Sequence, residues 1–269
     1  MKRKTLPPLA AFLAFALLST GHATPYTYTT ADGNGADTMI AFDQRFPNTT
    51  DDTNYGTYQF PGVKDLTGLL GTTTPPNAVW TQKAYVRFDT TGLAGTVTDA
   101  SLDIDFLALG GSSGVINVFG LADGLAGETW AESTITYNNA PANDLTSGGG
   151  SYITPGTGGV VATDAAFLGT LTVGASDGHY TFSSTALVDF LNADTNHLVT
   201  FILTAATSGN NMQFYSKENA ASATYPTLAV TAVPEPSTYA LTLGGFAMLI
   251  GLRNIRRRRI GPDPKLSRR

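Results

Sequence analysis

The chain has 269 residues, of which 42% are hydrophobic and 14% are charged. This composition excludes an intrinsically disordered chain, and the 29 glycines and 14 prolines favour a turn-rich all-β fold over a helical one. The absence of cysteine excludes disulfides, thiolate metal sites and a cysteine nucleophile.

Charge is partitioned along the chain. All of the 21 acidic residues except Asp263 lie between residues 24 and 236. The same stretch holds only five of the 16 basic residues, namely Arg45, Lys64, Lys83, Arg87 and Lys217. Such an acidic surface repels polyanions, so we expect no nucleic-acid partner. The other basic residues gather at the two ends, where they favour a role in membrane topology.

Residues 1–23 are typical of a secretory signal peptide. A basic start at residues 2–4 precedes a short apolar region at residues 9–18, and Gly21 and Ala23 supply the small residues that signal peptidase accepts. We therefore expect cleavage after Ala23. The alternative is an uncleaved N-terminal anchor, although the apolar region is short for a membrane span.

Residues 24–231 are expected to form one domain, and patterns of alternating apolar and polar residues recur through residues 26–231, as in strands with one buried face. In Ser101–Phe106, for example, Leu102, Ile104 and Phe106 are expected to face the core. Further strands are expected at Tyr85–Phe88, Val115–Phe119, Phe167–Val173, His179–Phe182, Leu198–Thr204, Met212–Tyr215 and Thr227–Val230. Nine or ten short strands without βαβ spacing predict one all-β domain, an antiparallel, jelly-roll-like β-sandwich.

One short helix interrupts this pattern. Ser183 or Ser184 is expected to cap a helix over Thr185–Leu191, in which apolar residues share one face. The Gly- and Thr-rich stretch 146–159 predicts a long surface loop.

Residues 232–269 form a tail with three parts. A Pro-Glu-Pro motif precedes the apolar stretch 239–252, which is expected to form a single transmembrane helix, and an arginine run follows it. The motif and the run consist of Pro234, Glu235, Pro236, Arg256, Arg257, Arg258 and Arg259. The tail resembles the PEP-CTERM sorting signal, which the membrane enzyme exosortase recognises and processes in Gram-negative bacteria that make exopolysaccharide. The extension 260–269 departs from that pattern, and the alternative is an ordinary C-terminal anchor with a Pro-rich stalk.

Several segments of the middle region also match one family in order. They are Asp52–Gly56, Ala84–Asp89, Val97–Leu102, Thr129–Pro141, Phe214–Glu218 and Tyr225–Leu228. Together they resemble the DNRLRE family of extracellular β-sandwich domains, which is related to carbohydrate-binding modules attached to alginate lyases. The resemblance covers roughly residues 30–231 and implies a noncatalytic domain without specifying a sugar. An apparent insertion at 65–78 and the long glycine-rich loop depart from the family pattern.

Candidate ligand contacts include exposed aromatic residues, because sugar rings stack on aromatic faces. Tyr55, Trp80, Tyr58 and Tyr152 lie in expected loops or strand edges, whereas Trp130 is expected to have a structural role at a strand start. For each of them, packing in the core or at an edge is the alternative.

Basic residues are a second group of candidates. Lys83 and Arg87 have the same parity on one expected strand, so they should share a face. With Lys217 they could contact the carboxylates of a uronic-acid polysaccharide. The alternative is a solvated sheet face that balances nearby aspartates.

Carboxylates form the third group. Asp51, Asp52, Asp103, Asp105 and Glu218 could supply oxygen ligands to a structural Ca²⁺. Their spacing matches no EF-hand, and solvation of acidic faces is the alternative.

The sequence favours a protein that is not an enzyme. His179 and His197 are far apart, and neither belongs to a triad or metal-binding motif. We expect an exported surface or matrix protein, transiently anchored by its tail, that binds or is embedded in exopolysaccharide. The alternatives are a structural or adhesion protein that makes protein contacts without sugar binding, and a polysaccharide-degrading enzyme.

Overall fold

A computed structural model describes residues 22–43, 52–66, 79–108, 113–145, 159–220 and 224–234. Thr24–Ala232 forms one compact unit. The expected signal peptide up to residue 21, the long loop at 146–158 and the tail from Glu235 onward lie outside the described residues. Within the described ranges, no helix has the length and apolar character needed to cross a membrane.

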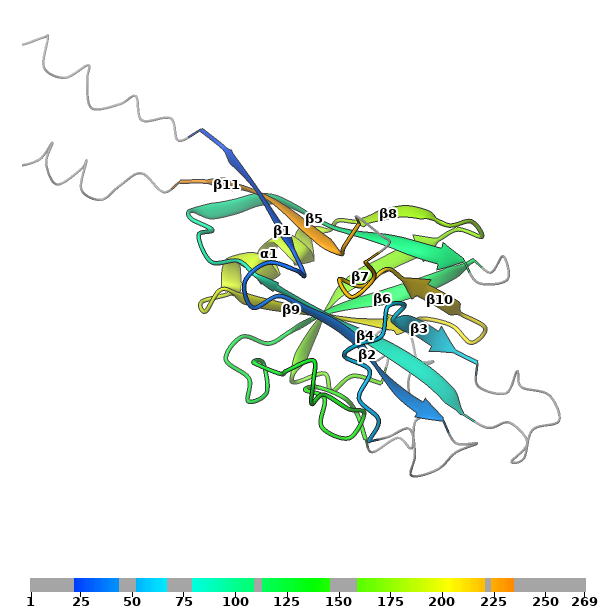
Figure 1. Ribbon diagram of the computed structural model, residues 1–269. Coiled ribbons are helices and arrows are strands. Elements are labelled where there is room, and N and C mark those ends of the chain that lie inside the picture. Colours follow the sequence, from blue (N-terminus) through cyan, green and yellow to red (C-terminus); the bar gives the residue numbers. More distant parts are fainter. Residues whose placement is uncertain are drawn as a thin grey trace, which may run out of the picture. The chain divides into compact units, whose positions relative to one another are not determined.

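Eleven strands form one hydrogen-bonded sheet that surrounds the core of this unit (Figure 1). In chain order the strands are β1 (Thr24–Thr29), β2 (Ala36–Asp43), β3 (Gly62–Asp65), β4 (Trp80–Asp89), β5 (Thr96–Ala108), β6 (Gly114–Leu121), β7 (Ala165–Val173), β8 (Gly178–Phe182), β9 (Leu198–Ala205), β10 (Asn211–Phe214) and β11 (Thr227–Val233). Their order in space is β1-β11-β5-β10-β3-β4-β9-β6-β7, with β2 added to β4 and β8 added to β5. The pairings of β1 with β11, β4 with β2 and β9, β5 with β8, and β6 with β7 and β9 are antiparallel.

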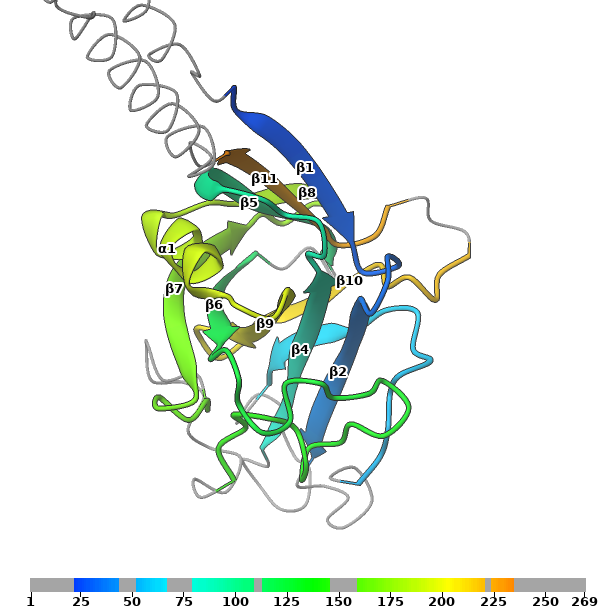
Figure 2. The ribbon, with the colours of Figure 1, turned by 90° about the vertical axis from the view of Figure 1, so that its left-hand side faces the viewer.

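The main core lies between strands that are distant in the order of the sheet. On β5, Leu102, Ile104 and Phe106 are at most 1% exposed, which confirms the inward face that their alternation predicts. The same hydrophobic cluster includes residues of β4, β6, β7, β9 and β11, so the sheet folds over on itself and encloses one core. Figure 2 shows β5 and β11 on one side of this core and β4 and β9 on the other.

The expected helix is present as α1 (Thr185–Ala193). Of the two serines that could begin it, Ser184 is the cap, because its Oγ accepts a hydrogen bond from the amide of Leu187 at 3.0 Å. Leu187 and Leu191 are buried against the main core. Apolar periodicity and a capping serine were therefore enough to locate this helix.

Three strands were not expected from the sequence, namely β1, β2 and β3. All eight residues of β2 except Phe42 are buried, so β2 lacks the alternation of a strand with one wet face. β3 is only four residues long and is also fully buried. Sequence alternation detects strands with one buried face, whereas β2 and β3 are buried on both faces. β1 is partly exposed, and its sequence of Thr, Pro and Tyr gives little contrast between an apolar and a polar face.

A second core explains why β2 and β4 are buried on both faces. Residues 122–145, here called the covering segment, pass across these strands as a series of turns (Figure 2). Trp130, Ile135 and Tyr137 of the covering segment pack with Tyr85 of β4 and Ile202 of β9. Trp130 is 7% exposed and has the structural role expected of it, although it directly follows a turn and is not at a strand start.

Candidate functional site

Lys83 lies inside the domain, on the face of β4 that the covering segment closes. It is 1% exposed, and its Nζ donates hydrogen bonds to Oδ1 of Asn143 at 2.7 Å and to the carbonyl of Gly159. The same nitrogen lies 5.6 Å from the centre of the Tyr137 ring. Burial lowers the pKa of Lys83 to about 7, because removal from water disfavours the charged amine. Lys83 thus joins β4 to the covering segment and is not a surface contact for a ligand.

Arg87 has a similar place on the same face of β4. Its guanidinium stacks on Trp130, with Cζ 4.7 Å from the ring centre, and donates to the carbonyls of Trp130 and Glu128. Its Nε donates to the carbonyl of Asn34 at 2.9 Å. Burial lowers the pKa of Arg87.

Lys83 and Arg87 therefore do lie on the same face of β4, as their spacing predicts. Neither expectation for that face, a contact with uronic-acid carboxylates or a solvated surface, is correct. The face is neither solvated nor open to a uronic acid, because the covering segment lies over it. Backbone carbonyls and an aromatic ring replace the water that these two cations lose.

Trp80 lies at the opposite end of β4. It is half-buried, and the ammonium of Lys64 lies 5.6 Å from the centre of its ring. In the β2–β4 register Trp80 pairs with Asp43, whereas Arg87 pairs with Ala36 at the other end. Seven residues of strand span about 23 Å, so Trp80 and Arg87 do not share a groove.

Tyr55 lies in a loop that presents an exposed aromatic side chain. This aromatic loop, residues 52–60, holds Tyr55 and Tyr58 edge to face, with ring centres 6.2 Å apart. Tyr58 is 43% exposed, and burial raises the pKa of Tyr55. The inner ring thus supports the outer one.

The aromatic loop is anchored on the covering segment. The side-chain amide of Asn54 donates to the carbonyls of Glu132 and Ile135. Gly56 approaches so closely that a Cβ there would lie 2.2 Å from the carbonyl oxygen of Glu132. A side chain at residue 56 would therefore push the loop away.

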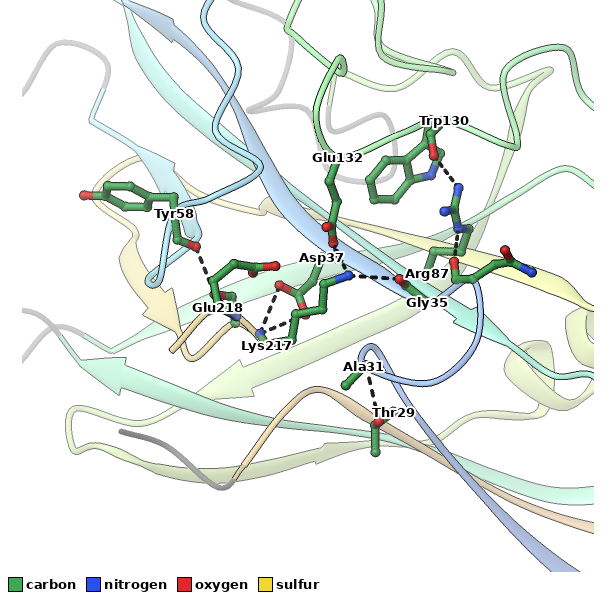
Figure 3. Close-up of polar contacts among 12 residues, drawn as sticks. Thr29, Ala31, Gly35, Asp37, Tyr58, Arg87, Trp130, Glu132, Lys217 and Glu218 are labelled. Carbon is green, nitrogen blue, oxygen red and sulfur yellow. Dashed lines mark hydrogen bonds and ion pairs between the residues drawn. The ribbon is translucent and has the colours of Figure 1, made fainter. Parts of the chain in front are cut away.

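Beside this loop lies an acidic cluster made of Asp37, Glu132 and Glu218 (Figure 3). One carboxylate oxygen from each lies within 4.8 Å of the others, and Asp37 is 0% exposed. Burial raises the pKa of Asp37 to about 7, and the charges of Glu218 and Glu132 add to this rise.

Lys217 closes one side of the acidic cluster. Its Nζ lies 2.7 Å from Oε1 of Glu132 and donates to the carbonyl of Gly35 at 3.0 Å. Its amide donates to both oxygens of Asp37, at 3.2 and 3.3 Å. The hydroxyl of the preceding residue, Ser216, donates to the carbonyl of Tyr58 at 2.9 Å. The structure thus brings Lys217 next to the aromatic loop, away from Lys83.

The other carboxylates expected to bind metal lie elsewhere, and Asp51 is outside the described residues. Asp52 accepts a hydrogen bond from Asn138, and Asp103 and Asp105 lie 3.4 and 3.0 Å from the ring nitrogens of His179. Among those candidates, only Glu218 belongs to the acidic cluster.

Sequence reasoning missed Asp37 and Glu132. Asp37 lies on the unrecognised strand β2, and Glu132 was noted only as part of a family block. The one signal in the sequence that could have identified Glu132 is its place in that block, directly after Trp130 and Ala131.

Comparison with known families gives two matches. Residues 38–156 match carbohydrate-binding module family 96, and residues 232–259 match the PEP-CTERM protein-sorting motif. No curated protein matches the chain. The first match includes the aromatic loop and the covering segment, whereas Asp37, Lys217 and Glu218 lie beyond its ends.

Both matches are noncatalytic in kind, and together they indicate an exported protein of the cell surface or exterior. They agree with the two resemblances seen in the sequence. The chain therefore carries a region similar to carbohydrate-binding module family 96, followed by a PEP-CTERM protein-sorting motif.

Proposed function

We propose that this chain is a noncatalytic surface or matrix protein whose β-domain binds, or is embedded in, extracellular polysaccharide. In this proposal residues 1–23 are removed by signal peptidase, residues 24–231 form a jelly-roll-like sandwich, and exosortase processes residues 232–269 while a transmembrane helix holds the tail. The match to a carbohydrate-binding module and to a sorting motif supports both halves of the proposal.

The single observation that carries the sugar-binding half is the geometry of Tyr58. This ring is exposed on a loop that is fixed to the covering segment, and Tyr55 supports it from the side. Aromatic faces pack on the C–H faces of sugars, and polar side chains at the edge of such a platform fix orientation. In Figure 3 the side chain of Glu218 points toward Asp37 and away from the Tyr58 ring, so Glu218 does not border this platform.

A neutral polysaccharide fits this surface better than a uronic-acid polymer. Lys83 and Arg87 are buried, and the ammonium of Lys217 is already paired with Glu132. The acidic stretch around them repels polyanions. We therefore propose a neutral polysaccharide as the ligand and keep a uronic-acid polymer as the alternative.

A glycan array probed with the full-length chain tests this proposal. We expect Tyr58→Ala to weaken binding by about tenfold or more, by analogy with nucleic-acid bases, for which stacking on one aromatic ring contributes about 1–3 kcal/mol. Phe167→Ala is the matched control, because Phe167 is 45% exposed but lies on β7. Equal binding by wild type and Tyr58→Ala would exclude Tyr58 as the sugar-binding platform. No binding to any glycan on the array would favour a structural or adhesion protein. Release of reducing ends from a bound glycan would instead reveal an enzyme.

The sorting half is tested separately. Pro234 directly follows β11 and is exposed, whereas Glu235, Pro236 and the arginine run lie outside the described residues. We expect Pro234→Ala with Glu235→Ala to retain the tail in the membrane fraction. Unchanged tail removal in that variant would contradict recognition of the motif by exosortase.

A further inference from the structure

We propose that Lys83 and Asn143 join into an amide cross-link between β4 and the covering segment after the domain has folded. In this reaction Nζ of Lys83 bonds to Cγ of Asn143, and the side-chain nitrogen of Asn143 leaves as ammonia. This inference does not rest on sugar binding. It follows from the contact between the two side chains, from their burial and from the backbone around Asn143.

The atoms that would react are already neighbours. Nζ of Lys83 lies 2.7 Å from Oδ1 of Asn143. Because a C=O bond is about 1.2 Å long, Cγ of Asn143 lies at most about 3.9 Å from Nζ. Groups that are held about 3–3.5 Å apart in a suitable orientation react far faster than the same groups in solution. A small shift of either side chain therefore brings Nζ and Cγ into reactive contact.

The amide of Asn143 is held at both of its polar atoms. Oδ1 accepts the hydrogen bond from Lys83, and Nδ2 donates to the carbonyl of Tyr137 at 2.6 Å. Ala142, the preceding residue, has φ of 56°, a left-handed conformation that is strained for a residue with a side chain. Asn143 also forms a β-bridge with Val160. The covering segment thus holds this amide in one orientation against Lys83.

Burial makes the amine of Lys83 reactive and keeps water away from it. Lys83 is 1% exposed and Asn143 is 7% exposed. Burial lowers the pKa of Lys83 to about 7, so above this pH the amine is mostly neutral and its lone pair can attack a carbonyl carbon. Exclusion of water also protects the new amide from hydrolysis.

The exchange needs no oxidant, reductant or second substrate. The lone pair of Nζ forms the Cγ–Nζ bond, and the electron pair of the Cγ–Nδ2 bond leaves with Nδ2. Nζ loses one proton and the leaving nitrogen gains one, so the products are a secondary amide and ammonia. The charge of Asp144 acts on Lys83, which places this carboxylate close enough to relay the proton.

Such a cross-link suits an exported chain that has no cysteine. Lys83 and Asn143 are 60 residues apart in the sequence. A covalent link across a segment of this length lowers the entropy of the unfolded chain, as a disulfide does, and should raise the Tm. The pH dependence of stability that the Lys83 amine causes belongs to the freshly folded chain, before the bond has formed.

Mass spectrometry of the purified full-length chain, after overnight incubation at about pH 8 to keep the Lys83 amine neutral, tests the proposal. We expect an intact mass that is one ammonia below that of the unlinked chain. A protease digest should contain the peptide of Lys83 joined to the peptide of Asn143. The joined peptide is required, because an asparagine that cyclises onto its own backbone also releases ammonia.

Variants of the reacting residues and of a second buried lysine provide the comparison. Lys83→Met and Asn143→Ala should lack the joined peptide. Lys64→Met should keep it, because Lys64 is also buried, at 8% exposure, but its ammonium lies over the ring of Trp80. Asp144→Asn should form the link at least about tenfold more slowly, since it removes the proton relay.

Separate peptides in the digest of the wild-type chain would overturn the proposal. This result does not depend on whether Lys83→Met or Asn143→Ala can fold. A wild-type rate of linking in Asp144→Asn would overturn the relay assigned to Asp144. Tyr58→Ala should form the link as wild type does, which separates failure of the cross-link from failure of the sugar site.

Discussion

The ammonium nitrogen of Lys217 lies 2.7 Å from Oε1 of Glu132, and this ion pair joins the segment after β10 to the covering segment. Both side chains are about four-fifths buried, with 21% and 20% exposure. The pair is therefore better shielded from solvent than a typical surface salt bridge.

Loss of this pair should destabilise the fold. Lys217→Met leaves three neighbouring carboxylates without their ammonium, so we expect the free energy of unfolding to fall by about 1–3 kcal/mol in the absence of divalent cations. Urea denaturation in EDTA measures the effect. Asp189→Asn on the exposed surface of α1 is the control, and an equally small change in both variants would contradict the role given to Lys217.

The two serines before α1 provide a second test. Ser184→Ala removes the hydrogen bond to the amide of Leu187 and a second one to the carbonyl of Leu168 at 2.9 Å. We expect a loss of about 1–2 kcal/mol for Ser184→Ala and almost none for Ser183→Ala, because Ser183 is exposed. Thermal unfolding of the two variants compares them directly, and a larger loss in Ser183→Ala would refute this capping assignment.

Lys83 should make stability depend on pH. Its pKa falls from 10.5 in the unfolded chain to about 7 in the fold because of burial, which outweighs the opposing charge of Asp144. Between these values the unfolded chain binds the extra proton, so this group makes stability rise as pH increases from 7 toward 10. Below about pH 7 the buried amine of Lys83 is charged in the fold. The stability that the neutral amine contributes at higher pH is then lost.

Comparison with Lys83→Met isolates this effect. The Tm of wild type minus that of the variant should grow as pH rises from 6 to about 9.5, below the range in which tyrosines titrate. The variant also leaves Oδ1 of Asn143 without its donor. This loss shifts the Tm of the variant equally at every pH and does not change the slope of Tm against pH. Parallel curves for the two proteins would show that Lys83 does not change protonation on unfolding.

The close approach of Gly56 to Glu132 predicts a link between loop position and binding. Gly56→Ala would place Cβ 2.2 Å from a backbone oxygen, so the aromatic loop must move. We expect glycan affinity to fall about as far as in Tyr58→Ala. Gly178→Ala, whose Cβ would meet only Tyr180 at 3.7 Å, should bind normally. Full affinity in Gly56→Ala would mean that the loop does not position the platform.

The sequence predicted those parts of the fold that obey a local pattern. Leu102, Ile104 and Phe106 alternate because only one face of β5 is buried against the core, and α1 has a periodic apolar face after a capping serine. The antiparallel all-β class and the short helix followed from such patterns. β2 could not be found in this way, because both of its faces are covered.

The site was harder to predict, because a distant segment decides what is exposed. Lys83 and Arg87 have the spacing of an open strand face, but the covering segment buries them. This segment has no strand or helix period, so nothing local places it over β4. Tyr55 and Lys217 were identified as single candidates, and only the tertiary fold brings the aromatic loop and Lys217 together around Glu132.

The most direct test is to measure by calorimetry whether the full-length chain binds exopolysaccharide. The polysaccharide should be purified from the bacterium that produces this protein. We predict saturable binding that is lost in Tyr58→Ala and kept in Phe167→Ala. Absence of binding to that polysaccharide, or equal binding by both variants, would contradict the account.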